Sequence, residues 1–343
     1  MGTIHLAVDA GGTSTRCVVV DERGGCLGFG RSASGNPIAA GPARAARSVA
    51  EAAGEALRQA SRAGGGEVSG GDVGLVLLAM AGASALSGPD VFAAELAPLG
   101  VDAPVRFAPD LLATFCSGTW QTEGYALVAG TGATAVRVEG GAVARTADGL
   151  GWLLGDDGSG FWVGHRAARA VAADLDGRGP RTALTALLLS ELGLIDDGAQ
   201  HQGRPAALQR LIEALYALRP VELARFARLV FDAAQAPSGD SVAQAIVAEA
   251  ADALLHTLAA VADPRVSGPI VLGGGTLAQH DALVARVAAA SGSGGTAAEV
   301  HRVADGVVGA AVMALREASV TVDRRVFERI ARTLDALRPL PRA

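Results

Sequence analysis

The sequence contains no lysine: all 29 residues counted as lysine or arginine are arginine. A chain without a side-chain amine cannot form a Schiff base, and it lacks the lysine with which a Walker A loop or a protein kinase holds ATP phosphates. Cysteine is also scarce. The three cysteines, Cys17, Cys26 and Cys116, have neither CxxC spacing nor a neighbouring histidine. We therefore expect small buried hydrophobic residues here, rather than a disulfide framework or a zinc site.

Long runs of like charge and long apolar segments are missing as well. The formal net charge is −6, and the sequence has no block of five like charges, so we expect no nucleic-acid partner. No apolar run without glycine, proline or charge approaches the roughly 18 residues of a membrane span. The first nine residues lack the basic region and cleavage site of a signal peptide. We expect a cytoplasmic protein with no membrane partner.

A pattern of strands separated by glycine turns occurs twice in the 343 residues, which is enough chain for two domains. We predict these strands at residues 6–9, 17–21, 26–30, 125–129, 133–138 and 142–146. Strand and helix units follow each set, so the sequence predicts an α/β fold of two domains. The predicted domains are residues 1–115 and residues 116–343, the second with a helical insert and a C-terminal helix. Small-molecule sites favour such junctions, so we expect the ligand in an interdomain cleft.

Apolar runs and helical periodicity define the remaining elements. We predict further strands at residues 73–79, 105–108, 270–272 and 300–303. We predict helices at residues 43–63, 89–99, 161–175, 180–193, 205–235, 240–262, 276–290, 306–318 and 322–337.

The first glycine turn, residues 9–15, reads Asp-Ala-Gly-Gly-Thr-Ser-Thr. Its glycines would let the backbone approach an anion closely, and its hydroxyls could bind that anion. The carboxylate of Asp9 suits Mg²⁺ bound through water. The alternative is a plain hairpin turn. The candidate nucleotide-binding residues in this turn are Gly11, Gly12, Thr13 and Thr15.

Two later glycine turns resemble the first. Residues 129–134 read Ala-Gly-Thr-Gly-Ala-Thr, and this repetition favours a pair of phosphate-binding hairpins. Residues 273–276, Gly-Gly-Gly-Thr, follow an apolar strand and open a predicted helix, whose N-terminus could face an anion. A plain strand-to-helix turn is the alternative for this third element. The candidate nucleotide-binding residues here are Thr131, Gly132, Gly273, Gly274, Gly275 and Thr276.

Acidic and amide side chains supply the remaining candidates. Asp110 follows an apolar strand and precedes a helix, so it could accept a proton from an attacking hydroxyl or serve as a helix N-cap. The loop 149–160 has five glycines and two adjacent acids, of which Asp156 could bind vicinal hydroxyls of a substrate. A structural turn is the alternative for this loop. Asn36 lies in a polar Ser-Gly-Asn-Pro turn and offers an amide donor and acceptor.

Together these elements resemble the sugar kinase, actin and heat-shock chaperone superfamily, and within it the N-acetylglucosamine kinase branch of the BadF-type ATPases. The resemblance spans residues 4–318 and is carried by DAGGTST, the S-GN turn, AGTGAT and GLGWLLGDDGSGFW. It implies two ribonuclease-H-like, actin-like ATPase domains that close over ATP, Mg²⁺ and an amino sugar. It also implies that Asp110 is the base that activates the sugar 6-hydroxyl. The sugar-binding residues that it implies are Asn36, Ala133, Thr134, Gly149, Leu150, Gly151 and Asp156.

Two departures from the family pattern bear on the acyl preference while leaving phosphotransfer intact. Ala133 stands where many members have serine, and Leu150 stands where some relatives have tryptophan. The resemblance favours N-acetylglucosamine, with glucosamine and N-acetylmuramic acid as alternatives. Other classes remain open: an ATPase that activates a radical dehydratase through a cysteine-held iron-sulfur cluster, and a regulator that binds sugar without phosphorylating it. A homodimer is another open expectation, since the terminal amphipathic helix could serve dimerisation.

Overall fold

The computed structural model describes residues 2–63, 68–82, 88–291 and 299–339. The chain is a mixed α/β protein with two five-stranded sheets and one two-stranded sheet in this described part. It divides into two compact units. Unit 1 comprises residues 1–126, 138–143 and 301–343, and unit 2 comprises residues 127–137 and 144–300. The predicted domains, residues 1–115 and 116–343, are defined by a repeated strand pattern and not by compactness. That division stays a prediction.

The first sheet begins with the antiparallel meander that the sequence predicts. Its strands are β1 (Ile4–Ala10), β2 (Thr15–Asp21), β3 (Cys26–Ser32), β4 (Val73–Met80) and β5 (Val105–Ala108). Strands β4 and β1 are parallel neighbours, and β5 pairs in parallel with β4, giving the order β3-β2-β1-β4-β5. The carboxyl ends of β1 and β4 therefore lie side by side, and Asp9 is found at this end of the sheet.

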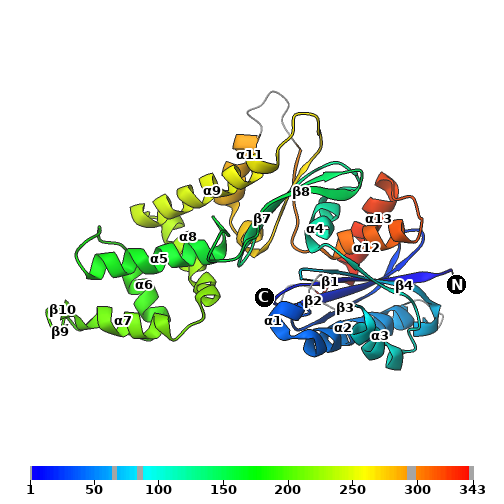
Figure 1. Cartoon of the computed structure of the whole chain (residues 1–343), viewed down its shortest axis with the longest axis horizontal. Helices are drawn as coiled ribbons and strands as arrows, with labels where there is room; N and C mark the ends of the chain where they lie inside the picture. The colour runs from blue at the N-terminus through cyan, green and yellow to red at the C-terminus, as the bar shows by residue number, and fades with distance from the viewer. Residues whose placement is uncertain (1, 64–67, 83–87, 292–298, 340–343) are drawn as a thin grey trace. The chain divides into compact units, whose positions relative to one another are not determined.

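Helices cover both faces of this first sheet. On one side lie α1 (Pro37–Ala40), α2 (Pro42–Ala63) and α3 (Asp90–Leu96); on the other lie α4 (Asp110–Gly118), α12 (Val307–Glu317) and α13 (Arg324–Leu337) (Figure 1). Helix α2 packs unusually close to β3. A Cβ atom on Gly28 would lie 2.0 Å from the carbonyl oxygen of Ala56, and one on Gly30 would lie 2.0 Å from that of Ala52. Only glycine fits at these two positions of β3.

The second sheet repeats the order of the first. Its strands are β6 (Gly124–Ala129), β7 (Ala133–Glu139), β8 (Ala142–Asp148), β11 (Ile270–Gly273) and β12 (Val300–Arg302), in the order β12-β11-β6-β7-β8. In both sheets the first strand of a three-strand meander is central. The meander extends on one side of it, and two later strands follow on the other. The predicted repetition of the strand pattern is confirmed.

The helices of unit 2 depart from the sequence prediction at two places. They are α5 (Gly160–Leu175), α6 (Leu184–Glu191), α7 (Ala206–Tyr216), α8 (Ala227–Gln235), α9 (Ser241–Val261), α10 (Gly275–Gln279) and α11 (Asp281–Ser291), and a small hairpin of β9 (Gln200–His201) and β10 (Arg204–Pro205) precedes α7. The single helix predicted over 205–235 is wrong, because a 3₁₀ segment starting at Pro220 separates α7 from α8. The single helix predicted over 276–290 is also wrong, since His280 is extended and separates α10 from α11.

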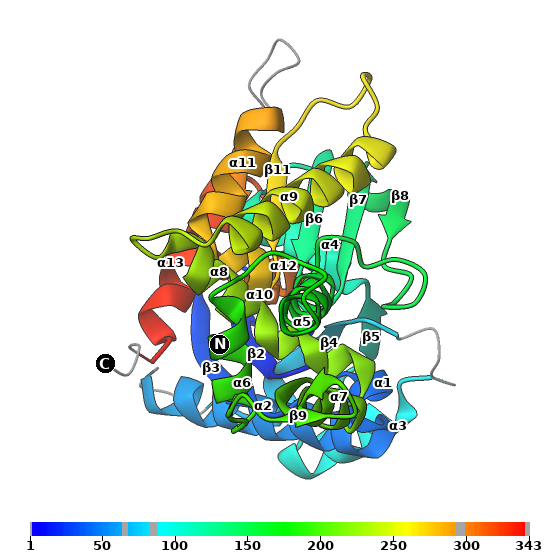
Figure 2. The same ribbon diagram turned by 90° about the vertical axis from the view of Figure 1, so that its left-hand side faces the viewer.

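Helix α9 is the one described helix with the length and apolar composition to cross a membrane, a test that a core helix also passes. In unit 2 it packs against α5, α8 and α11, with buried residues such as Ile246, Leu254 and Val261 along its length (Figure 2). Packing within unit 2 thus accounts for these buried side chains.

Candidate active site

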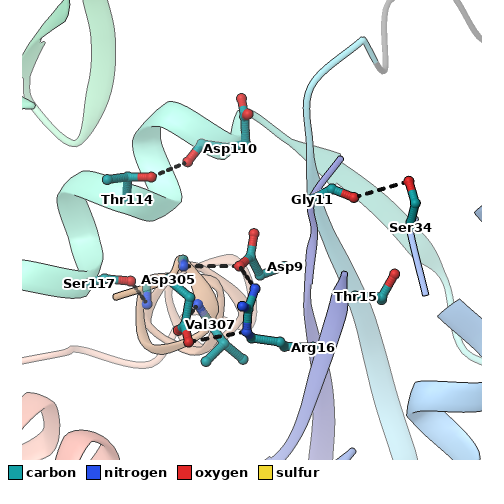
Figure 3. A network of polar contacts seen from close by, with 12 residues as sticks. Asp9, Gly11, Thr15, Arg16, Ser34, Asp110, Thr114, Ser117, Asp305 and Val307 are labelled. Atoms are coloured by element: carbon teal, nitrogen blue, oxygen red, sulfur yellow. Dashed lines mark hydrogen bonds and ion pairs between the residues drawn. The ribbon is translucent and has the colours of Figure 1, made fainter. Parts of the chain in front are cut away.

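Asp9 lies at the end of β1 in a buried polar network (Figure 3). The antiparallel register places Arg16 of β2 directly opposite it, and the Arg16 Nη1 atom lies 3.5 Å from the Asp9 Oδ2 atom. The backbone N–H of Gly306, just before α12, donates to the same Oδ2 atom at 3.0 Å. Both contacts fall on Oδ2, so no described group bonds to Oδ1. That oxygen could serve as a ligand.

Asp305 extends this network into a chain of alternating charges. Its Oδ2 atom lies 3.3 Å from the Nε atom of Arg16, and its Oδ1 atom lies 2.8 Å from the Nη2 atom of Arg338. The Asp305 side chain is 6% exposed and that of Asp9 is 13% exposed. We call Asp9, Arg16, Asp305 and Arg338 the charge ladder. Sequence reasoning missed its last three members, although the hairpin register could have predicted the pair of Asp9 and Arg16.

The surroundings of Asp9 disfavour its charged form. Burial, and then the negative charge of Asp305, raise its pKa from 3.8 to about 6, while Arg16 and the Gly306 N–H partly offset them and Asp110 adds a further rise. A cation beside these carboxylates would relieve the repulsion. In the described residues no three His, Cys, Asp or Glu side chains form a metal cluster. An all-oxygen site with few protein ligands fits Mg²⁺, which keeps several waters.

The first glycine turn is held to the segment that carries Asn36. The Gly11 N–H donates to the Ser14 carbonyl at 3.0 Å, and the Gly35 N–H donates to the Gly11 carbonyl at 3.2 Å. Gly12 and Thr13 are exposed, as a phosphate-binding turn requires. Thr15 is buried instead.

Thr15 and Asn36 each make a local bond in this region. The Thr15 hydroxyl donates to the Ala33 carbonyl at 2.7 Å, and the Asn36 Oδ1 atom accepts from the Ile38 N–H at 2.8 Å, at the start of α1. A Cβ on Gly35 would lie 2.4 Å from the Thr15 Oγ1 atom, which explains the glycine before Asn36. The predicted contacts of Thr15 with the nucleotide and of Asn36 with the sugar stay predictions.

Asp110 is the first residue of α4, and Pro109 is the residue in the N-cap position. The alternative interpretation of Asp110 as the N-cap is therefore wrong. Its carboxylate accepts from the adjacent Leu111 N–H at 3.0 Å, and burial raises its pKa. In Figure 3 the Asp110 carboxylate points out of α4. It points in the same direction as the Oδ1 atom of Asp9. A carboxylate with a raised pKa is suited to general-base chemistry.

In unit 2 the second and third glycine turns form one structure. The Gly130 carbonyl accepts from the Gly160 N–H at 2.7 Å and from the Thr276 hydroxyl at 3.0 Å. A Cβ on Gly130 would lie 3.7 Å from the Gly275 nitrogen. The hairpin of residues 130–132 and the loop of residues 273–276 thus lie side by side, as a shared nucleotide site needs.

Gly274 has a conformation that only glycine adopts readily. Its φ is +88° and its ψ is 150°, and an added Cβ would lie 2.5 Å from the Ala129 carbonyl oxygen. The preceding Gly273 is buried at the end of β11, whereas Gly275 is exposed with open space around it. The helix that follows, α10, has only five residues. The loop backbone, rather than a long helix dipole, is the feature available to a ligand here.

Two acids shape the loop 149–160. The Asp148 carboxylate accepts from the N–H of Asp156 at 2.7 Å and from the N–H of Asp157 at 3.1 Å. Asp156 has a φ of +61°, and its Oδ1 atom accepts from the Ala133 N–H at 3.0 Å. Burial raises the pKa of Asp156, and the neighbouring acids add to the rise. A Cβ on Gly132 would lie 2.7 Å from this Oδ1 atom, so the glycine makes room for the carboxylate.

The remaining predicted sugar residues lie around this loop. The Gly149 N–H donates to the Ala133 carbonyl at 2.9 Å, and the Thr134 hydroxyl donates to the Ala147 carbonyl at 3.1 Å. Leu150 is 64% exposed, and Gly151 has open space where a Cβ would be. Thr131 is exposed, and its carbonyl accepts from the Phe161 N–H at 3.1 Å. The predicted sugar loop and the second phosphate hairpin are thus joined within unit 2.

Comparisons with known proteins show the family of this chain and its relatives. The sequence matches the BadF/BadG/BcrA/BcrD ATPase family over residues 6–314. It is 27% identical over 294 residues to the N-acetyl-D-glucosamine kinase of Dictyostelium discoideum, covering 82% of this chain and 87% of that protein. It is 28% identical over 186 residues to the glucosamine kinase GspK of Vibrio cholerae, covering 54% of this chain and 60% of that protein.

Two solved structures share the fold. A candidate N-acetylglucosamine kinase of Chromobacterium violaceum superposes with a TM-score of 0.67 at 24% identity, covering 92% of this chain and 99% of that one. A ROK family glucokinase of Streptomyces griseus, solved with glucose and AMPPNP, superposes with a TM-score of 0.53 at 21% identity, covering 91% of this chain and 99% of that one. The fold is that of the actin-like ATPases, as the sequence predicts.

Proposed function

Because the chain belongs to the BadF/BadG/BcrA/BcrD ATPase family, we propose that it is a kinase that transfers the γ-phosphoryl group of ATP to the 6-hydroxyl of an amino sugar. The observation that carries the proposal is the state of Asp110. It is a carboxylate that is not the N-cap of α4, that has a raised pKa, and whose charge acts on Asp9. The similarity to two amino-sugar kinases supports the choice of acceptor.

In the proposed reaction Asp110 takes the proton of the sugar 6-hydroxyl as that oxygen attacks the γ-phosphorus. A new P–O bond forms, the bond to the β,γ-bridging oxygen breaks, and ADP leaves. Little covalent chemistry is required of the protein, so correct placement of the two substrates supplies much of the rate. The raised pKa of Asp110 makes it a better proton acceptor than an ordinary carboxylate.

Mg²⁺ bound with ATP would neutralise phosphate charge, and Asp9 is the residue that would hold it, through its free Oδ1 atom or through water. The glycine turns would bind the phosphates through backbone N–H groups, so no lysine is needed. In unit 2 the joined loops of residues 130–132 and 273–276 would hold the nucleotide, since nothing lies within 4 Å of a Cβ on Gly275 and its backbone is therefore approachable.

We assign sugar binding to the loop 149–160. Asp156 is fixed by the Ala133 N–H and offers a carboxylate oxygen to sugar hydroxyls. Position 133 contributes its backbone N–H to Asp156, since alanine has no side-chain hydroxyl to offer the sugar. N-acetylglucosamine is the proposed substrate, with glucosamine and N-acetylmuramic acid as alternatives. The cytoplasm remains the proposed location.

The cysteines favour a kinase over an ATPase that shares an iron-sulfur cluster. All three are free and buried, and burial raises the pKa of Cys26 to about 12 and that of Cys116 to about 11. A buried thiol with a raised pKa is a poor source of the thiolate that binds iron. Cys17 lies within β2 and is likewise buried.

The test is Asp110→Asn, which preserves the shape of the side chain and removes the base. We expect kcat for N-acetylglucosamine phosphorylation to fall by a factor on the order of 10² to 10⁴, while the sugar and a non-hydrolysable ATP analogue still bind. Asp102→Asn, an exposed change in the turn before β5, is the matched control and should leave kcat unchanged. Near-normal turnover in Asp110→Asn would refute the assignment. An ADP-release assay over hexoses and amino sugars identifies the acceptor.

A further inference from the structure

The end of helix α13 is fixed to the first sheet of unit 1. The Thr333 hydroxyl oxygen accepts from the backbone N–H of Cys26 at 3.0 Å. The Leu337 carbonyl accepts from the Gln59 Nε2 atom of α2 at 3.3 Å. Arg338 directly follows the helix, and its guanidinium lies 2.8 Å from the buried Asp305 carboxylate. Arg338 thus links the end of α13 to the other members of the charge ladder.

We propose that Arg338 and Asp305 are positioning residues for Asp9 and that they act through Arg16. The inference rests on the proposed function only in that Asp9 holds the Mg²⁺–nucleotide. It gives the C-terminal helix a role in nucleotide binding, beyond the packing that covers the sheet.

The geometry of Arg16 is the reason. Its Nε atom contacts Asp305 and its Nη1 atom contacts Asp9, so one guanidinium is shared between two buried carboxylates. Arg338 supplies a second cation to Asp305, whose Oδ1 atom otherwise accepts, among the described residues, only from the Val307 N–H at 3.3 Å, and a buried carboxylate is disfavoured unless its charge is well balanced. Without Arg338, Asp305 would draw Arg16 toward itself. Asp9 would then lose the contact that fixes its Oδ2 atom and would keep only the Gly306 N–H.

The orientation of Asp9 thus depends on a residue that does not touch it. A change of Oδ1 position by about 1 Å is enough to weaken a site that must hold Mg²⁺ in near-ideal geometry. If the ion pair of Arg338 and Asp305 served only folding, its loss would lower thermal stability and leave the nucleotide affinity of the folded protein unchanged.

The experiment compares the wild type with Arg338→Gln in the full chain. We measure by calorimetry the Kd of the Mg²⁺ complex of a non-hydrolysable ATP analogue and the Kd of N-acetylglucosamine. The nucleotide Kd should rise about tenfold, and the sugar Kd should not change. Arg338→Lys, which keeps the charge but loses the planar fork, should restore part of the affinity. Arg332→Gln is the matched control, because Arg332 is exposed on the same helix and takes part in no ion pair between described residues.

Salt separates positioning from long-range charge. A loss of affinity that persists from about 0.1 M to about 1 M salt supports positioning, since exposed, distant charges are screened over that range. A loss that disappears at high salt, or a lower Tm with an unchanged nucleotide Kd, would overturn the proposal. Asp305→Asn provides a second variant if Arg338→Gln does not fold. It removes the contact that holds the Arg16 Nε atom, so Arg16 is fixed less firmly beside Asp9, and nucleotide binding should weaken by a smaller factor than in Arg338→Gln. A wild type that binds the Mg²⁺–nucleotide but phosphorylates no amino sugar would contradict the proposed function and leave this inference standing.

Discussion

The charged form of Asp9 should cost the unliganded protein stability, so Asp9→Asn is expected to stabilise the fold while it abolishes Mg²⁺-dependent nucleotide binding. The pKa of Asp9 rises from 3.8 to about 6, mainly through burial and the charge of Asp305. A shift of about 2 units, at about 1.4 kcal/mol for each unit, sets an upper bound of roughly 3 kcal/mol. Because the asparagine also weakens the pair with Arg16, we expect a net gain of about 1 to 2 kcal/mol.

The pH dependence gives this prediction its sign. The folded protein has the higher pKa, so it binds more protons than the unfolded chain between about pH 4 and pH 6. The stabilising contribution of protonated Asp9 is complete below about pH 4 and is lost as the pH rises through 6. The advantage of Asp9→Asn should therefore be largest above about pH 7 and should vanish near pH 4.

Urea unfolding with EDTA present, at several pH values, measures this difference. Asp102→Asn is the control, and as an exposed substitution it should change stability by less than about 0.5 kcal/mol at every pH. If Asp9→Asn is less stable than the wild type at neutral pH, or if its advantage does not depend on pH, the reasoning about the buried charge is wrong.

Two further substitutions test unit 2. Gly274→Ala places a Cβ 2.5 Å from the Ala129 carbonyl oxygen at a φ of +88°, so it should lower the unfolding free energy by about 1 to 3 kcal/mol and weaken nucleotide binding. Gly12→Ala, where nothing lies within 4 Å of the Cβ, is its control in denaturant unfolding, and equal losses would contradict the steric argument. Asp148→Ala removes the acceptor of two N–H groups in the loop that holds Asp156, so steady-state kinetics should show a sugar KM raised about tenfold, equivalent to about 1.4 kcal/mol. A change confined to the KM for ATP would contradict the sugar assignment.

The repeated elements could be predicted from the sequence because their signals are local. Alternating strands and glycine turns identify both meanders, and the apolar β4 reads as a strand buried on both faces. The breaks inside the two long predicted helices are different. Pro220 carries a visible signal for the first break, but the extended backbone of His280 depends on its packing, including a ring stacked on Phe231 with centroids 3.5 Å apart. Helical periodicity alone does not mark that break.

Site residues that belong to a local sequence motif could be predicted. Site residues that only the tertiary structure brings together could not. Asp9 and Asp110 could be selected because Asp9 lies at the end of a strand and Asp110 follows one. Asp305 and Arg338 lie about 300 residues from Asp9 in the sequence. Asp305 precedes α12 and Arg338 follows α13, and neither belongs to a sequence motif that indicates a binding site. Arg16 was within reach, because the hairpin register opposes it to Asp9. The glycine motifs were visible, but the contact between Gly130 and Gly275 required the fold.

The discontinuity of unit 1 has a consequence for biosynthesis. Helices α12 and α13 cover and clamp the first sheet, yet they leave the ribosome only after all of unit 2 has been made. At roughly 5 to 20 residues per second, the nascent sheet waits on the order of ten seconds or more with only α4 on the face that α12 and α13 later cover. During translation, therefore, the amino-terminal half is the part of this protein most in need of a chaperone.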